Sequence, residues 1–371
     1  MIKTTLGKKN TMIIKLIIIM VIFCFTTSNT VRSQEYSFIY DTIERSYLLH
    51  IPSSYNDADV PLIIAIHGWQ RDPQKMEYHS HLSEKSDEEG FIVAYPKGTG
   101  NPLEWNTGEE GVDDAGFINA LIDTLINHYL IDTNKIYLTG FSNGAEMTYK
   151  VAQKYGNRIA GIAPVACPFW DENNPPVKHM PIIHFHALND GAVSYSTVQP
   201  VLDEWIAFNS CSETSETFYV VDGAYGEIWK DETGNADIVL FSTTTGSHSW
   251  PGGEISWFTP SQAISATDLL WDFFTGQLKG NGGTKVTEKN KKDINVNLYP
   301  NPATGNFILS NLNELKDPYI FVINQNGSII NSFEPVTNNF SVSAENLNSG
   351  IYFIKIVTRD QVILKTLSVI K

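Results

Sequence analysis

A serine lies between two glycines at residues 140–144, in the order Gly-Phe-Ser-Asn-Gly. The short apolar run at 135–139 is typical of a strand, and the residues from Ala145 onward are typical of a helix. A serine on so sharp a turn projects its hydroxyl from the edge of a sheet, and a Cβ on either flanking residue would clash. The pattern predicts that Ser142 is a nucleophile; the alternative is an ordinary strand–turn–helix pair of glycines.

An acid and a base follow in the chain order that such a nucleophile requires. Asp190 leaves the apolar strand predicted at 182–186 in a turn, and His248 follows the strand predicted at 237–242. A serine hydroxyl is a poor nucleophile at neutral pH, so an imidazole must take its proton, and a carboxylate fixes the tautomer of that imidazole. We therefore expect Ser142, His248 and Asp190 to act together. Taken singly, Asp190 could be a turn residue and His248 a surface histidine.

A tetrahedral oxyanion needs two backbone N–H donors. The residue after the nucleophile, Asn143, supplies one of them, and the loop after the third strand should supply the other. The third strand is predicted at 61–66, because this continuous apolar run is typical of a parallel sheet, and it ends in His67-Gly68-Trp69. The N–H of Trp69 is thus the second expected donor.

Two further pairs of polar residues invite a functional reading. His184 and His186 point to one face of their predicted strand, as a pair of metal ligands would. No supporting ligand cluster accompanies them, so we expect them to pack and to orient the acid loop, and we expect neither a metal nor a cofactor. Asp113 and Asp114 begin a predicted helix, where carboxylates cap free N–H groups; the alternative is a direct part in catalysis.

Taken together, these segments resemble the polyhydroxybutyrate depolymerase and feruloyl esterase family, which are secreted α/β-hydrolases of the carbohydrate esterase family one type. The segments are His67-Gly68, Trp105, residues 112–118, 140–144, 186–190 and 248–252. The resemblance covers about residues 36–277, and it implies hydrolysis of acetyl or hydroxycinnamoyl esters on plant polysaccharide, or of aliphatic polyesters. Many members have small residues after His-Gly where this chain has Trp69. The resemblance therefore supports the catalytic mechanism more strongly than the choice of substrate.

The alternation of strands and helices predicts the α/β-hydrolase fold, a mostly parallel sheet with helices on both faces. We expect the first two strands to pair antiparallel and the rest to be mainly parallel. The predicted strands are 36–41, 45–51, 61–66, 91–95, 135–139, 159–165, 182–186 and 237–242, and the predicted helices are 75–88, 113–129, 143–155, 197–208 and 260–275.

Trp69, Trp105 and Trp250 all fall on predicted loops at the catalytic edge of the sheet. Their flat apolar faces would suit a hydroxycinnamoyl ring or a sugar ring, whereas a polyester chain asks for a longer aliphatic groove. We expect them to bind substrate, with core packing as the alternative. This favours a polymeric ester substrate of the feruloylated or acetylated xylan kind over polyhydroxybutyrate.

The first 33 residues are typical of a signal peptide, because lysines precede a short apolar run at 16–25 and small polar residues follow it. Met12 could be the true start, and a retained membrane anchor is the alternative. The residue before Cys24 is not the small one that lipoprotein processing requires, so we expect no lipidation and no membrane span in the mature protein. Cys167 and Cys211 then remain, either as a disulfide or as two buried thiols.

The composition changes at residues 278–295, which we predict to be a flexible linker after an esterase domain at 34–277. Residues 296–371 alternate apolar and polar, the pattern of a small antiparallel β-sandwich. This segment resembles the C-terminal sorting domain of type IX secretion, which implies that machinery as a partner and passage across the outer membrane to the cell exterior. A carbohydrate-binding sandwich is the alternative.

The chain has 371 residues and a formal net charge of -15, which argues against nucleic acid or an anionic membrane as a partner. The full order of serine, acid and base favours a secreted serine esterase over a catalytically silent binding protein on the same fold. A serine peptidase would use the same machinery, so it stays an alternative at this point.

Overall fold

The structure is a computed structural model of the chain. The predicted signal peptide, apart from Ser33, and residues 280–295 of the predicted linker lie outside the part that it describes. The described residues are 33–56, 58–233, 237–255, 257–279, 296–315, 318–324, 329–333, 335, 337–358 and 362–371.

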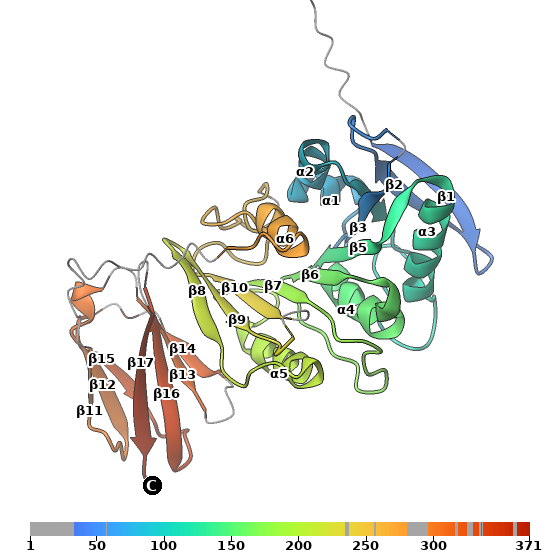
Figure 1. Cartoon of the computed structure of the whole chain (residues 1–371). Coiled ribbons are helices and arrows are strands. Elements are labelled where there is room, and N and C mark those ends of the chain that lie inside the picture. Colours follow the sequence, from blue (N-terminus) through green and yellow to red (C-terminus); the bar gives the residue numbers. More distant parts are fainter. Residues whose placement is uncertain are drawn as a thin grey trace, which may run out of the picture. The chain divides into compact units, whose positions relative to one another are not determined.

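The larger part of the described chain is built on a ten-stranded sheet with the strand order β1-β2-β4-β3-β5-β6-β7-β10-β9-β8 (Figure 1). Neighbours are parallel from β4 through β3, β5, β6 and β7 to β10, and antiparallel at both edges. The strands are β1 (Gln34–Tyr40), β2 (Ile43–His50), β3 (Val60–Ile66), β4 (Ile92–Pro96), β5 (Ile131–Phe141), β6 (Gly161–Val165), β7 (Ile182–Ala187), β8 (Glu216–Val221), β9 (Ala224–Trp229) and β10 (Ile238–Thr243).

Helices cover both faces of this sheet, because its central strands are apolar on both sides. In β3, Leu62, Ile64 and Ile66 join one hydrophobic cluster with α3, α4 and α5, while Ile63 and Ala65 join another with α1, α2 and α6. The helices are α1 (Pro73–Ser80), α2 (Leu82–Glu89), α3 (Asp114–His128), α4 (Asn143–Tyr155), α5 (Val198–Asn209) and α6 (Ala266–Phe274), with 3₁₀ turns at Gly156–Arg158 and Tyr195–Thr197. The predicted α/β-hydrolase architecture is confirmed.

Two local predictions were wrong, and one hairpin was missed. The helix expected at 75–88 is two helices, because His81 takes a left-handed conformation with φ 55° and ends α1. The helix expected at 260–275 begins only at Ala266, where the Ser265 side chain accepts the N–H of Asp268. The hairpin of β8 and β9 was missed, although Asp222-Gly223 between two apolar-rich runs is a hairpin signal and Gly223 has φ 86°.

The C-terminal residues form two antiparallel sheets, in the orders β11-β12-β15 and β14-β13-β16-β17. Both sheets contribute to one hydrophobic core, with Phe307 from the first and Ile354 from the second fully buried, so the predicted β-sandwich is confirmed. No helix of the described residues is long and apolar enough to cross a membrane. The strands are β11 (Asn297–Tyr299), β12 (Asn306–Ser310), β13 (Tyr319–Ile323), β14 (Ile329–Phe333), β15 (Phe340–Ser343), β16 (Gly350–Val357) and β17 (Val362–Val369), with a 3₁₀ turn at Leu312–Glu314.

Candidate active site

The nucleophile elbow joins the end of β5 to the start of α4. Ser142 has φ 54° and ψ -123°, a backbone conformation that is strained for any residue with a side chain, and its N–H donates to the carbonyl of Val165 on β6 at 2.9 Å. A Cβ on Gly140 would lie 2.2 Å from the carbonyl oxygen of Gly144, and one on Gly144 would lie 2.2 Å from that of Ile66. The two glycines are therefore required by the close approach of β5, α4 and β3, as the sequence predicted.

Three loops at the carboxyl edge of the sheet bring Ser142, His248 and Asp190 together. Nε2 of His248 lies 2.8 Å from Oγ of Ser142, and its Nδ1 lies 2.8 Å from Oδ2 of Asp190. These loops follow β5, β7 and β10, which are near neighbours in the parallel part of the sheet, so their carboxyl ends meet at one edge. The structure thus unites three residues that the sequence separates by up to 106 positions.

The protonation states in this trio follow from its hydrogen bonds. The Asp190 carboxylate is fully buried; burial alone would raise its pKa, but the hydrogen bond and charge of His248 and the N–H of Val193 hold that pKa below its ordinary value. An ionised carboxylate only accepts, so Nδ1 of His248 carries the proton. Nε2 is then the free base that faces the hydroxyl of Ser142. This is the tautomer that can take the proton of the serine during attack.

The expected oxyanion donors lie on two segments that are held against each other. Asn143 is the first residue of α4, so its N–H has no acceptor within the helix. Its side chain pairs with the backbone of Trp105 in both directions: Oδ1 accepts from the N–H at 2.8 Å, and Nδ2 donates to the carbonyl at 3.2 Å. Gly68, the neighbour of Trp69, packs directly on Ser142, since a Cβ added there would lie 3.4 Å from the Cβ of the serine.

A buried histidine fixes the loop that carries Trp69. Nδ1 of His67 donates to the carbonyl of Gly68 at 2.8 Å, and its Nε2 accepts the N–H of Gly98 at 2.9 Å. Burial lowers the pKa of His67 from 6.5 to about 4, so the ring is neutral at neutral pH. The indole N–H of Trp105 donates to the carbonyl of His67 at 2.8 Å. His67 and Trp105 therefore hold the oxyanion loop through its backbone.

The three tryptophans expected to bind substrate differ in exposure. The structure corrects the expectation for Trp105. It is 3% exposed, packs at a tilt against His67 and uses its N–H within the protein, so it presents no face to a ligand. Trp250 is also buried and donates to Thr267, but it lines a pocket. Trp69 is 46% exposed and stays a candidate for stacking.

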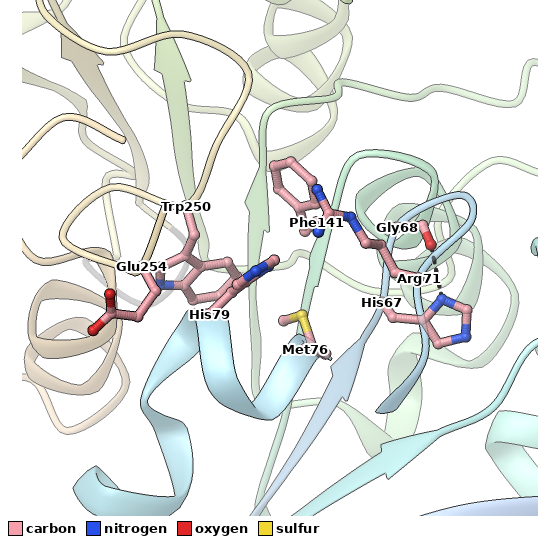
Figure 2. A pocket seen from close by; sticks show the side chains of 8 residues that line it. All are labelled: His67, Gly68, Arg71, Met76, His79, Phe141, Trp250 and Glu254. Atoms are coloured by element: carbon pink, nitrogen blue, oxygen red, sulfur yellow. Dashed lines mark hydrogen bonds between the residues drawn. The ribbon is translucent and has the colours of Figure 1, made fainter. Parts of the chain in front are cut away.

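The pocket beside the site is lined by residues from three segments, and Figure 2 shows their side chains. It touches the oxyanion loop at Gly68 and the elbow at Phe141, and the guanidinium of Arg71 lies 4.2 Å over the ring of Trp257. Sequence analysis missed Arg71 and Trp257, although both lie within ten residues of predicted site residues. The lining residues are His67, Gly68, Arg71, Met76, His79, Phe141, Trp250 and Glu254.

The rings of His184 and His186 are hydrogen-bonded to each other. Nε2 of His184 lies 3.2 Å from Nδ1 of His186, and both rings are buried. Within the described part of the chain, no group of three or more His, Cys, Asp or Glu side chains is placed to hold a metal ion.

The disulfide considered for Cys167 and Cys211 is absent, and both side chains are thiols. Cys167 follows the carboxyl end of β6, and its thiol donates to Glu146. Cys211 follows α5, whose last residue Asn209 is hydrogen-bonded to Met180 just before the amino end of β7. The two cysteines thus lie at opposite ends of the parallel strands, Cys167 at the carboxyl ends and Cys211 near the amino ends. Strands of this length separate them by roughly 15 Å. A disulfide spans less than about 7 Å between Cα atoms.

The two aspartates at the start of α3 have separate roles. Asp113 caps the helix, since its Oδ1 accepts the N–H of Gly116 at 3.0 Å, as predicted. Asp114 instead forms a fully buried ion pair with Arg45 at 2.6 Å and accepts the N–H of Asn106 at 2.7 Å. Neither carboxylate has a hydrogen bond to Ser142 or His248 among the described residues.

Comparison with known proteins gives family matches for two segments of the chain. Residues 45–194 match the family described as esterase PHB depolymerase, and residues 297–370 match the secretion system C-terminal sorting domain. The acetyl xylan esterase from Aspergillus awamori, a solved structure, has a TM-score of 0.50 at 16% identity and covers 65% of this chain and 99% of that one. The chain therefore has the α/β-hydrolase fold, with one segment that matches the esterase PHB depolymerase family and a C-terminal segment that matches the sorting domain.

Two curated relatives are similar to the first of these parts. The bifunctional acetylxylan esterase/xylanase XynS20E of Neocallimastix patriciarum is 31% identical over 170 residues, which are 46% of this chain and 25% of that protein. Feruloyl esterase B of Piromyces equi is 26% identical over 238 residues, which are 57% of this chain and 44% of that protein. The chain spans less than half the length of either relative.

Proposed function

We propose that this protein is a secreted serine carboxylic ester hydrolase that releases acetyl or feruloyl groups from plant polysaccharide of the xylan kind. The observation that carries the proposal is the hydrogen-bonded trio of Ser142, His248 and Asp190 on an esterase PHB depolymerase domain. The relatives named as acetylxylan and feruloyl esterases support the ester chemistry.

The reaction follows from the protonation states of the trio. Nε2 of His248 takes the proton of Ser142 as Oγ attacks the ester carbonyl, and Asp190 stabilises the imidazolium that forms. The N–H groups of Asn143 and Trp69 bind the oxyanion of the tetrahedral intermediate. His248 then protonates the ester oxygen of the sugar as its bond to the acyl carbon breaks, so the sugar leaves as an alcohol and the acyl group stays on Ser142. Water activated by the same imidazole releases the acid and restores the serine.

The exposed aromatic residues support a ring-bearing polymer as the substrate. Trp69 and Trp257 are 46% and 60% exposed, and the ring of Phe258 stands edge-on to His248 at 5.8 Å between centroids. Aromatic faces at the rim of a site suit sugar rings or a hydroxycinnamoyl ring. Depolymerisation of polyhydroxybutyrate is the second candidate, because the matching family is described by that activity.

Export through type IX secretion belongs to the same proposal. The C-terminal sorting domain supports it, together with the lysine-flanked apolar run of the first 33 residues, which we propose to be a signal peptide. We assign residues 34–277 to the esterase, 278–295 to a linker and 296–371 to the sorting module. A chain that ends at residue 295 should remain in the periplasm, and its normal release into the medium would contradict the assignment.

The function is tested by assaying the full chain and its Ser142→Ala variant on nitrophenyl acetate, methyl ferulate, acetylated xylan and a polyhydroxybutyrate film. We expect acetate or ferulate release by the native protein and a loss of about five to six orders of magnitude in kcat for the variant. Near-native turnover by Ser142→Ala would refute the mechanism. Clearing of the film without release from the other substrates would establish the polyester as the substrate instead.

A further inference from the structure

A chain of buried hydrogen bonds leads from α4 to the acid of the trio. The hydroxyl of Tyr149 lies 3.0 Å from Nδ1 of His184, whose Nε2 lies 3.2 Å from Nδ1 of His186. Nε2 of His186 lies 3.0 Å from the carbonyl oxygen of Val193 and 3.5 Å from Oδ2 of Asp190. Tyr149, His184 and His186, which we name the buried histidine chain, are each at most 1% exposed.

The direction of every hydrogen bond in the buried histidine chain can be deduced from its last member. A carbonyl oxygen can only accept, so Nε2 of His186 carries a proton. Burial lowers the pKa of both rings, so each is neutral, and Nδ1 of His186 must be an acceptor. His184 therefore donates from Nε2 and accepts at Nδ1 from the Tyr149 hydroxyl. All donors point from Tyr149 toward the acid loop, and the last of them donates to the carbonyl of Val193.

His186 acts on the acid loop in two ways. It binds the carbonyl of Val193, while the N–H of the same residue donates to Oδ1 of Asp190 at 2.8 Å, so His186 immobilises a peptide that holds the carboxylate. The same Nε2 also lies 3.5 Å from Oδ2, the oxygen that His248 uses, so the partial positive charge of its N–H stabilises the carboxylate. The titratable groups that face His186 are His184, Asp190 and His248, and the ring of Tyr195 stands edge-on to it.

The neutrality of His186 matters because an imidazolium beside Asp190 would compete with His248 for the carboxylate charge. Protonation of His186 at Nδ1 would place two N–H groups face to face unless His184 moved its proton from Nε2 to Nδ1 and donated to the Tyr149 hydroxyl. Two donors opposed in a buried site are strongly unfavourable. A charge on His186 would thus require the hydrogen bonds from His186 through His184 to Tyr149 to reverse.

We propose that His186 is a positioning residue for the catalytic acid, and that His184 and Tyr149 hold it as a neutral donor. This inference rests on the proposed role of Asp190. It gives the His-x-His pair of β7 a part in setting the rate, distinct from both core packing and metal binding.

The test compares His186→Leu with His186→Gln in the full chain, because the amide nitrogen of glutamine can replace Nε2 and leucine cannot. With nitrophenyl acetate, we expect His186→Leu to lower kcat roughly tenfold or more and to change KM less than about twofold. Without the N–H of His186, the Asp190 carboxylate stabilises the protonated form of His248 more strongly and raises its pKa. The acidic limb of the pH profile of kcat/KM should therefore move to higher pH. His186→Gln should restore most of kcat and return the limb toward its native position.

His50→Leu serves as the matched control, because His50 is another buried histidine and lies on β2, away from the trio. It should leave kcat per folded molecule and the acidic limb unchanged. Nitrogen-15 NMR of labelled histidine at neutral pH should show one protonated ring nitrogen on each of His184 and His186.

Several results would overturn the inference: an unmoved acidic limb in His186→Leu, equal impairment of the glutamine and leucine variants, or an imidazolium at either ring. Such a result with an active native protein would leave the proposed esterase standing. A native protein that hydrolyses no ester would contradict both the proposed esterase function and the inference about His186.

Discussion

Two groups of loops meet at Ser142, and they use their residues in opposite ways. On the oxyanion side, which comprises residues 67–71, 105 and 143, the expected reacting groups are backbone N–H donors, and the side chains of His67, Trp105 and Asn143 bind backbone. On the acid–base side, which comprises residues 186–193 and 248, the expected reacting groups are the side chains themselves. The first side should tolerate changes of residue type that keep the backbone in place, and the second should not.

Among the variants that compare these two sides, Asp190→Asn should have the largest effect. An asparagine amide can donate to Nδ1 of His248 and so favour the tautomer whose Nε2 already carries a proton, which cannot act as a base. We expect kcat on nitrophenyl acetate to fall about 10³–10⁴-fold, with the fold intact by circular dichroism. Asp203→Asn is the matched control, because Asp203 is a carboxylate on α5 that bonds Gln199. A loss of activity in Asp203→Asn but not in Asp190→Asn would show that the acid was misassigned.

On the oxyanion side, Trp69→Pro should have the next largest effect, because proline removes the N–H while Trp69→Ala keeps it. Loss of one oxyanion donor costs about 10²–10³-fold in kcat. We expect that loss from the proline variant, measured on nitrophenyl acetate at matched folded concentration. Equal rates for Trp69→Pro and Trp69→Ala would show that Trp69 donates nothing to the oxyanion.

The stability of the oxyanion side should depend on pH through His67. Its pKa in the folded protein is about 4 against 6.5 in a free chain, so between these values the unfolded chain binds a proton that the folded one does not. The contribution is complete above pH 6.5 and is lost as pH falls toward 4, which amounts to about 3 kcal/mol in the free energy of unfolding.

The measurement for His67 is a series of denaturant unfolding curves from pH 7 to pH 4 for the native protein and His67→Asn. Asparagine keeps a donor near the position of Nδ1 but does not titrate. The unfolding free energy of the variant should fall less steeply over this range. Identical slopes would mean that His67 is not the neutral buried group described above.

Trp69→Ala should have the smallest effect and is the sharpest check on the comparison. If the oxyanion side acts through its backbone, kcat on nitrophenyl acetate should stay within about threefold of the native value. A tenfold or larger fall on this small substrate, in a variant of unchanged melting temperature, would mean that the indole itself takes part in the chemical step.

The expected site was easier to predict from the sequence on the acid–base side than around the substrate. Ser142, Asp190 and His248 each follow a recognisable apolar strand, and parallel strands place their carboxyl ends together, so chain order was enough to propose the trio. Arg71 and Trp257 have no such marker. They meet only because the loop after β3 and the loop after His248 lie side by side, and no local pattern encodes that contact.

The sequence by itself determined the strands of the parallel part of the sheet, the glycines of the elbow and the types of side chain that could react. It did so because sterics at Gly140 and Gly144 and the apolar period of the strands act over a few residues. Tertiary structure alone decided that Trp105 is buried while Trp69 is exposed, and that Cys167 and Cys211 lie at opposite ends of the parallel strands. Exposure and pairing depend on neighbours that are distant in the chain, so they are settled only when the sheet and its helices pack.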